Sequence, residues 1–150
     1  FKYLGLHLSQ DLSWTDHITH ITNSANKMLG YLRLNLFMAQ SHVRLLAYIT
    51  LVRPKLEYAS AIFDPHQSNL TKALQSVQNR SARFILSEYS YHASVSSLTS
   101  KLELVPLASC SRISRLCLYH RFFHTMPRDS QLIQLTHRSF RTSHLNAVIP

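Results

Sequence analysis

SWTDHITHITNSANKMLGYLR, residues 13–33, is the clearest helical pattern in the chain. Its apolar side chains recur at steps of three and four residues, which places them on one stripe of an α-helix. They are Trp14, Ile18, Ile21, Ala25, Met28, Leu29 and Leu32. Ser13 and Asp16 have the spacing of a capping box, in which both side chains accept backbone amides of the first turn. The pattern therefore predicts a helix that begins at Trp14 and continues to about Arg33.

A second helical pattern covers residues 41–63, with Ser41 as the candidate N-cap. Pro54 lies inside it, and a proline there removes one amide and clashes with the carbonyl of the preceding turn. We therefore expect either a kinked helix or two helices that meet near Arg53. Asp64-Pro65-His66 is the expected stop.

A third pattern, residues 68–86, predicts an amphipathic helix with Ser68 or Asn69 as its cap. Its apolar side is expected to contain Leu70, Leu74, Val77, Phe84 and Ile85. Its opposite side is expected to contain Lys72, Ser76, Asn79, Arg80 and Arg83. Cations and an amide on one face suit contact with a phosphate backbone that does not depend on base sequence. An ordinary solvated helix surface is the alternative reading of this face.

Weaker patterns cover the two ends of the chain. Residues 1–8 predict a short strand, residues 94–102 a short helix, and residues 106–126 a longer one. The buried side of that last helix is expected to contain Ile113, Leu116, Cys117, His120 and Phe123. Its other side is expected to contain Arg112, Arg115 and Tyr119.

Together these patterns predict an all-α fold, a bundle of about five helices with a short N-terminal strand and a poorly ordered C-terminal tail. We expect a strand and turn over residues 1–12, a helical domain over residues 13–126, and an irregular tail over residues 127–150. The chain begins without an initiator methionine and stops in a segment without periodicity, so we expect it to be a fragment of a larger protein.

The composition favours a basic protein that binds nucleic acid. Sixteen Lys and Arg against seven Asp and Glu give a net charge of +9 and a pI near 10.0. These cations are dispersed along the chain, which disfavours a basic tail and suggests single charges spaced along helices. No stretch approaches 18 apolar residues, so we expect no membrane span. Cys110 and Cys117 would lie about 10 Å apart along one helix, too far for a disulfide, and reduced thiols fit an intracellular protein.

The residues of the usual catalytic and metal sites are sparse. No two of the seven acids are closer than five residues, and two glycines leave no phosphate-binding loop. Cys110, Cys117, His120 and His124 are good zinc ligands, but roughly 21 Å of helix separates the first from the last. A partial site at Cys117 and a His17–His20 pair remain open, with packing favoured for both. We therefore expect no catalytic residue, no bound metal and no cofactor.

An ordered series of short strings runs through residues 1–120. It comprises Tyr3-Leu4-Gly5, Leu12-Ser13-Trp14, His17-Ile18, Ile21, Ala25, Leu29, Leu32, Tyr48, Thr50-Leu51-Val52-Arg53-Pro54, Leu56-Glu57-Tyr58-Ala59-Ser60, Asp64-Pro65, Leu74, Val77-Gln78-Asn79, Ala82-Arg83 and Ile85. The series resembles the region that follows the catalytic palm in jockey-like and other LINE-type (non-LTR) retrotransposon reverse transcriptases. Phe63 stands where many relatives have tryptophan, which changes packing and not role.

The resemblance implies a thumb-like helical region that cradles an RNA/DNA primer–template beside the upstream palm of the same polyprotein. The aspartates that bind magnesium in this family lie in that palm, and no such pair is present here. The family also implies a location in the cytoplasm and the nucleus. The residues expected to contact nucleic acid are Lys72, Asn79, Arg80, Arg83, Arg53, Arg112 and Arg115. The alternative is a decayed or domesticated segment that packs only against proteins.

Overall fold

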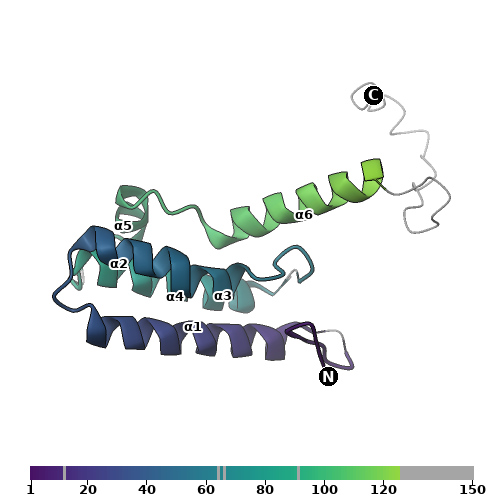
Figure 1. The fold of residues 1–150 in the computed structure, drawn as a ribbon, viewed down its shortest axis with the longest axis horizontal. Helices are drawn as coiled ribbons and strands as arrows, with labels where there is room; N and C mark the ends of the chain where they lie inside the picture. The colour runs from purple at the N-terminus through teal and green to yellow at the C-terminus, as the bar shows by residue number, and fades with distance from the viewer. Residues whose placement is uncertain (12, 64, 66, 91, 126–150) are drawn as a thin grey trace. The chain divides into compact units, whose positions relative to one another are not determined.

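The structure is a computed structural model that describes residues 1–11, 13–63, 65, 67–90 and 92–125, and it is mostly helical (Figure 1). The chain divides into two compact units, Phe1–Cys117 and Leu118–Pro150. The elements are β1 (Lys2–Tyr3), β2 (Leu6–His7), α1 (Thr15–Asn35), α2 (Ser41–Ala47), η1 (Tyr48–Val52), α3 (Arg53–Glu57), α4 (Ser68–Leu86), α5 (Val95–Lys101) and α6 (Leu107–Thr125). The all-α prediction is confirmed. The expected tail, residues 127–150, lies outside the described residues.

The N-terminal residues form a hairpin and not the single strand that was predicted. β1 and β2 pair antiparallel, and the turn between them is Leu4-Gly5, with φ of 46° and 87°. Two successive positive φ values are typical of a type I′ turn, which reverses the chain within two residues. The Tyr58 hydroxyl donates to the Leu4 carbonyl at 2.8 Å, and a Cβ on Gly5 would lie 3.2 Å from the Tyr58 ring. Gly5 therefore serves both the turn and the close approach of Tyr58.

Helix α1 buries the predicted stripe but lacks the predicted cap. Trp14 is the N-cap residue, and no side chain caps the helix. Ser13 is held in the preceding turn, where its N–H donates to the Asp11 carboxylate at 3.1 Å and its Oγ lies 3.3 Å from the Ser9 Oγ. The helix therefore starts at Thr15, one residue later than expected. The residues of the stripe that are buried are Ile18, Ile21, Ala25, Leu29 and Leu32.

The segment with Pro54 is a continuous helical run interrupted by a wider turn. Helix α2 passes into η1, a π-helical turn in which the Arg53 N–H bonds to the Tyr48 carbonyl, and α3 follows with Pro54 in its first turn. The expected irregularity near Arg53 therefore takes the form of a π turn directly before Pro54, and the helical run continues through it. The helix ends at Glu57 and not at residues 64–66. Ala59, at φ 56°, turns the chain away earlier.

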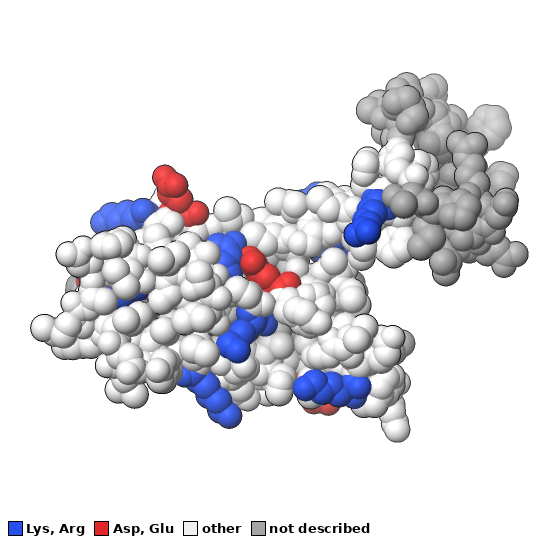
Figure 2. All heavy atoms as spheres, in the orientation of Figure 1, with Lys and Arg blue, Asp and Glu red and all other residues white. Residues whose placement is uncertain are grey.

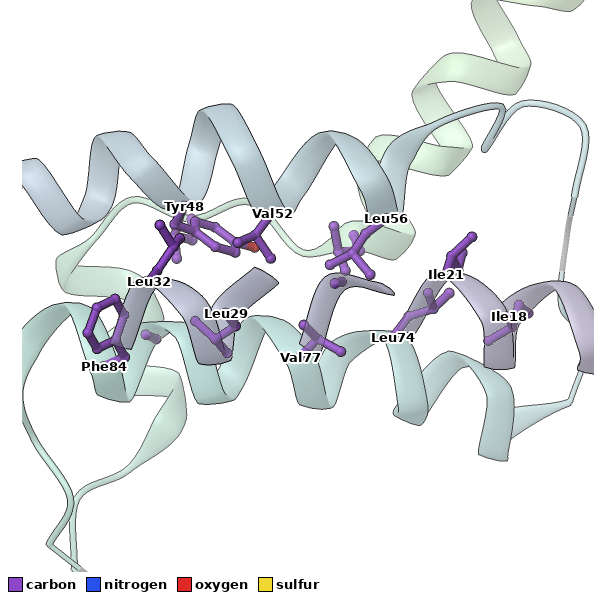
Figure 3. Close-up of a cluster of buried hydrophobic side chains, with 14 of the residues drawn as sticks. Ile18, Ile21, Leu29, Leu32, Tyr48, Val52, Leu56, Leu74, Val77 and Phe84 are labelled. Carbon is purple, nitrogen blue, oxygen red and sulfur yellow. The ribbon is translucent and has the colours of Figure 1, made fainter. Parts of the chain in front are cut away.

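The core lies between α1, the α2–η1–α3 run and α4, which lie alongside one another (Figure 1). In Figure 3, Leu32 of α1 extends toward Tyr48 of η1, and Leu29 of α1 lies closer to Val77 of α4. Buried residues from α5, the loop after it, the start of α6 and the hairpin add to this cluster. They are Leu98, Leu104, Leu107 and Leu6.

The buried side predicted for α6 is wrong. Ile113 and Leu116 are 58% and 60% exposed, and Cys117, His120 and Phe123 are exposed as well. The apolar residues of α6 are spread around the helix, so no single stripe is available to face a core. Among the described residues, the buried contribution of α6 is Leu107 at its first turn.

Candidate nucleic-acid interface

Helix α4 places its predicted polar residues opposite its buried side. The stripe of Leu74, Val77 and their neighbours faces the core, as predicted. Lys72 and Arg80 are exposed, and Asn79 and Arg83, on the same side of the helix, are half-buried. The α4 basic face is defined here as Lys72, Asn79, Arg80 and Arg83.

Two side chains of the α4 basic face are held along the helix by local hydrogen bonds. The Arg80 Nε donates to the Ser76 carbonyl at 3.3 Å, and its Nη2 donates to the Ser76 Oγ at 3.2 Å. The Asn79 Oδ1 accepts from the Gln75 Nε2 at 3.2 Å. A guanidinium has five N–H donors, so about three of those on Arg80 remain for an external acceptor. The Arg80 fork is thus oriented before any partner arrives.

The charge on this face is not neutralised by neighbouring acids. α4 contains no Asp or Glu, and in the described part of the chain none of Lys72, Arg80 and Arg83 forms an ion pair. An exposed helix with mixed charge usually offers carboxylates at i±4 to its own cations. Figure 2 shows that on the face drawn there, Lys and Arg are scattered, and several of them lie beside Asp or Glu.

Arg53, by contrast, is engaged inside its own unit. Its Nε lies 2.7 Å from the Glu57 Oε1, its Nη2 donates to the Cys110 Sγ at 3.1 Å, and its side chain is 16% exposed. Burial alone would lower the pKa of Arg53, but the hydrogen bond and charge of Glu57 outweigh it, and the pKa is raised. Both partners lie outside the α4 basic face, and Glu57 neutralises the charge.

The two arginines of α6 differ in their surroundings. Arg115 lines a small cavity of about 70 Å³ together with Thr71 and Gln75 of α4. Gln75 is the residue that binds Asn79, so the structure brings Arg115 next to the predicted face. Arg112 is exposed on the same helix.

Neither a family model nor a curated protein nor a solved structure matches this chain. The resemblance to LINE-type reverse transcriptases therefore rests on the ordered strings of the sequence. None of the described helices is both long and apolar enough to cross a membrane. Within the described ranges, no three His, Cys, Asp or Glu side chains are grouped so that they could hold a metal ion, and both cysteines are free.

Arg44 is a structural residue that the sequence patterns did not single out. Its Nε donates to the Leu36 carbonyl at 3.1 Å and its Nη2 to the Phe37 carbonyl at 2.6 Å, after the last turn of α1. Its Nη1 donates to the Phe84 carbonyl at 3.0 Å and to the Ser87 Oγ, at the end of α4. This Arg44 bridge satisfies carbonyls at two helix C-termini, where a cation also opposes the helix dipole. Four donors are used in this way, which leaves Arg44 poorly suited to bind phosphate.

Gln78 is another polar residue used inside the fold. It is fully buried on α4, and its Nε2 donates to the Val105 carbonyl at 3.2 Å. This contact ties α4 to the loop before α6. Its place in the matched string Val77-Gln78-Asn79 therefore has a packing explanation.

A cluster of histidines closes the hairpin end of α1. His17 is fully buried, with its ring centroid 4.9 Å from that of Phe63, so the packing role expected for it is confirmed. Its Nδ1 accepts the His7 N–H at 3.4 Å, and its Nε2 has no partner in the described structure. Burial lowers the pKa of His17, and the nearby His7 and His20 lower it further. This histidine is therefore neutral in the folded chain near pH 7.

Proposed function

We propose that this chain is the thumb-like helical region of a non-LTR retrotransposon reverse transcriptase and that it holds primer–template nucleic acid through α4. The observation that carries the proposal is the α4 basic face, where three cations have no carboxylate partner among the residues that the structure describes. Such cations gain the most from phosphate, because each contact releases condensed counterions. The ordered strings of residues 1–120 support the same assignment.

The spacing of the cations fits a run of phosphates. From Lys72 to Arg83 the helix advances about 16 Å at 1.5 Å per residue. One nucleic-acid strand presents a phosphate about every 3.4 Å along a duplex axis, so this distance spans roughly five of them. Arg80 supplies an oriented fork, and Lys72 supplies a compact charge on a flexible stem. Contacts of this kind position a duplex and do not read its sequence.

The upstream palm of the same polyprotein is the proposed protein partner. The hairpin exposes Phe1, Tyr3 and Leu4 at 84%, 61% and 73%, which is an apolar surface that a neighbouring domain would cover. In this proposal the palm also supplies the magnesium-binding aspartates. The described residues contain no carboxylate group that fits that role, so magnesium is not assigned to this chain.

The chain by itself is proposed to have no polymerase, nuclease or hydrolase activity, because positioned acids or a nucleophile beside a base are required for such chemistry. Primer extension by the purified chain, with magnesium or manganese and a primed template, tests this directly. Incorporation of nucleotides above the level of a buffer blank would contradict it.

The binding experiment measures affinity for an RNA–DNA hybrid as a function of salt concentration. Log K is expected to fall with log salt at about −0.9 per phosphate contact, and three contacts give a slope near −3. Arg80→Ala with Arg83→Ala is expected to flatten the slope by about one to two units, with unchanged circular dichroism.

The matched control is Lys2→Ala with Lys27→Ala, which removes the same charge from exposed positions on β1 and α1. It is expected to alter the slope by less than the α4 pair. If both pairs change the slope equally, net charge and not the α4 basic face is responsible. Binding that does not depend on salt concentration would mean that phosphate contacts are not responsible at all. That result would favour the protein-packing alternative.

A further inference from the structure

Two pairs of histidines in the described part of the chain bring their rings close together. The rings of His120 and His124, one turn apart on α6, have centroids 4.2 Å apart and planes inclined by 46°. Those of His7, on β2, and His20, on α1, have centroids 4.3 Å apart. Imidazole nitrogen is a good ligand for zinc, copper and nickel, and zinc binds it at about 2.0–2.1 Å. Two rings this close can therefore be ligands of one ion.

The pair on α6 is open to an incoming ion. His120 and His124 are both exposed. Residues i and i+4 of a helix lie on the same side, with Cβ atoms about 5–6 Å apart, so both rings can reach one point in the solvent. This is the spacing at which two histidines of one helix bind zinc. Helix α6 contains no Asp or Glu, so no carboxylate of the same helix competes for these rings.

Ring packing orients one member of the α6 pair before an ion binds. The Phe123 ring meets the His124 ring edge-on, with centroids 5.3 Å apart and planes at 82°. Tyr119 stacks on Phe123 with centroids 6.2 Å apart, which continues the contact along the helix. A side chain that is already oriented loses less conformational entropy when it binds, which raises the affinity available from a given contact.

The other close pair, His7 with His20, is poorly suited to hold an ion. The His7 Nε2 is buried, and it has no hydrogen-bond partner in the described structure. Burial lowers the pKa of His7, and the charges of His20, Lys2 and the N-terminal ammonium lower it further. Surroundings that disfavour a proton on this ring also disfavour a metal cation. This pair is therefore a comparison within the same chain for the pair on α6.

We propose that His120 and His124 form a binding site for a divalent transition-metal ion, namely zinc, copper or nickel, with one nitrogen from each ring as its ligand. No bound metal was expected from the sequence, because the four candidate ligands of α6 are too far apart to meet at one ion, but two of them can. Magnesium and calcium prefer oxygen ligands and are not expected here. Water completes the coordination. The proposal does not depend on the nucleic-acid role of α4.

The test titrates Zn²⁺ into the full chain, freed of metal beforehand, and follows binding by isothermal titration calorimetry. The tightest step is expected to take one ion per chain. His120→Gln and His124→Gln are each expected to weaken that step at least about tenfold, because losing a ligand costs no less than losing a group that orients one. Mg²⁺ at the same concentration is expected to give no such step. Absence of Zn²⁺ binding, or equal binding of Mg²⁺, would overturn the proposal.

Two control variants locate the site. Phe122→His with His124→Phe keeps the composition of the chain but places the histidines at i and i+2, which do not face each other on a helix. It is expected to weaken the tightest step as much as the single substitutions do. His20→Gln removes an exposed ring of the other close pair and is expected to leave the step unchanged. Full affinity in the rearranged chain, or a loss in His20→Gln that exceeds the loss in His120→Gln, would overturn the proposal.

Discussion

Helices α4 and α6 are equally long, at 19 residues, and each carries three cations among many apolar side chains. Eight residues of α4 are buried. In α6, within the described Phe1–Cys117 unit, Leu107 is the buried residue. The two helices differ in order and not in composition, because the apolar residues of α4 fall on one stripe and those of α6 are distributed around the helix. Burial, and the free energy that comes with it, follows the periodic order of the side chains.

The largest expected effect comes from matched truncations on the two helices. Val77→Ala, at a fully buried position of α4, is expected to lower the free energy of unfolding by about 1–4 kcal/mol, because it leaves a cavity. Ile113→Ala, at a 58% exposed position of α6, is expected to change it by less than about 0.5 kcal/mol. Urea denaturation followed by circular dichroism measures both. Equal losses would mean that α6 packs as tightly as α4.

The next effect tests how the end of α4 is held. Arg44→Ala removes the Arg44 bridge and leaves the Leu36 and Phe84 carbonyls without their donor. The expected loss is about 1–3 kcal/mol in the free energy of unfolding. Arg44→Lys should recover only part of it, since an ammonium cannot reproduce the planar fork. A lysine variant as stable as the parent chain would mean that charge alone supports these two helix ends.

The dependence of stability on pH compares a buried histidine, His17 of α1, with an exposed one, His120 of α6. Because the folded-state pKa of His17 lies below its ordinary value of 6.5, the unfolded chain takes up a proton more readily. The stability contributed by neutral His17 is full above about pH 6.5 and is lost as the pH falls toward the folded-state pKa. His7, whose pKa is lowered by burial and then by His20 and Lys2, acts in the same direction.

Melting temperatures at pH 7.5 and 5.5 measure this effect, and the chain is expected to melt earlier at the lower pH. His17→Phe removes the titrating ring from a site already packed against Phe63 and should reduce the difference. His120→Gln on α6, where the ring is exposed, should leave the difference as it is. If the His17→Phe variant kept the full difference in melting temperature, groups other than His17 would be responsible for the pH dependence.

The smallest expected effect concerns the orientation of Arg80. Ser76→Ala removes the hydroxyl that receives the Arg80 Nη2 at 3.2 Å and should weaken hybrid binding by no more than about threefold. Stability should change by less than about 0.5 kcal/mol. Ser109→Ala, an exposed position of α6, is the control. If the control loses more affinity for the hybrid than Ser76→Ala does, the orientation of Arg80 by Ser76 does not contribute to binding.

The sequence predicted the features that depend on local periodicity. The stripes of α1 and α4, and with them the exposed placement of Lys72 and Arg80, follow from steps of three and four residues. The stripe assigned to α6 was wrong because its apolar side chains allow several nearly equal faces, and only contact with a core selects one. The pattern of positive φ at Leu4 and Gly5 was missed because Leu4 has no intrinsic preference for it.

The sequence patterns did not predict contacts between distant segments of the chain. The carbonyls that Arg44 binds belong to Leu36, which precedes α2 in the chain, and to Phe84, which follows it. No spacing within α2 therefore predicts these contacts. Arg53 was expected at the nucleic-acid interface because it is a cation in a matched string. Its pairing with Glu57 could have been anticipated from the i,i+4 spacing, but its contact with Cys110 depends on the fold.

The π turn of η1 constrains how this chain can change in length. Tyr48, Val52 and Leu56 are all buried, although successive steps of four residues in a regular α-helix rotate about 40° too far each time. The wider turn absorbs that excess rotation and keeps the three side chains in register. Deleting one residue from Tyr48–Val52 would restore a regular helix and leave the rotation of the segment before it nearly unchanged, because a π turn contains one residue more than the α turn that it replaces. The π turn is therefore the place in this helical run where the loss of one residue disturbs the register with the core least, whereas a deletion within α2 or α3 would rotate the flanking side chains by about 100°.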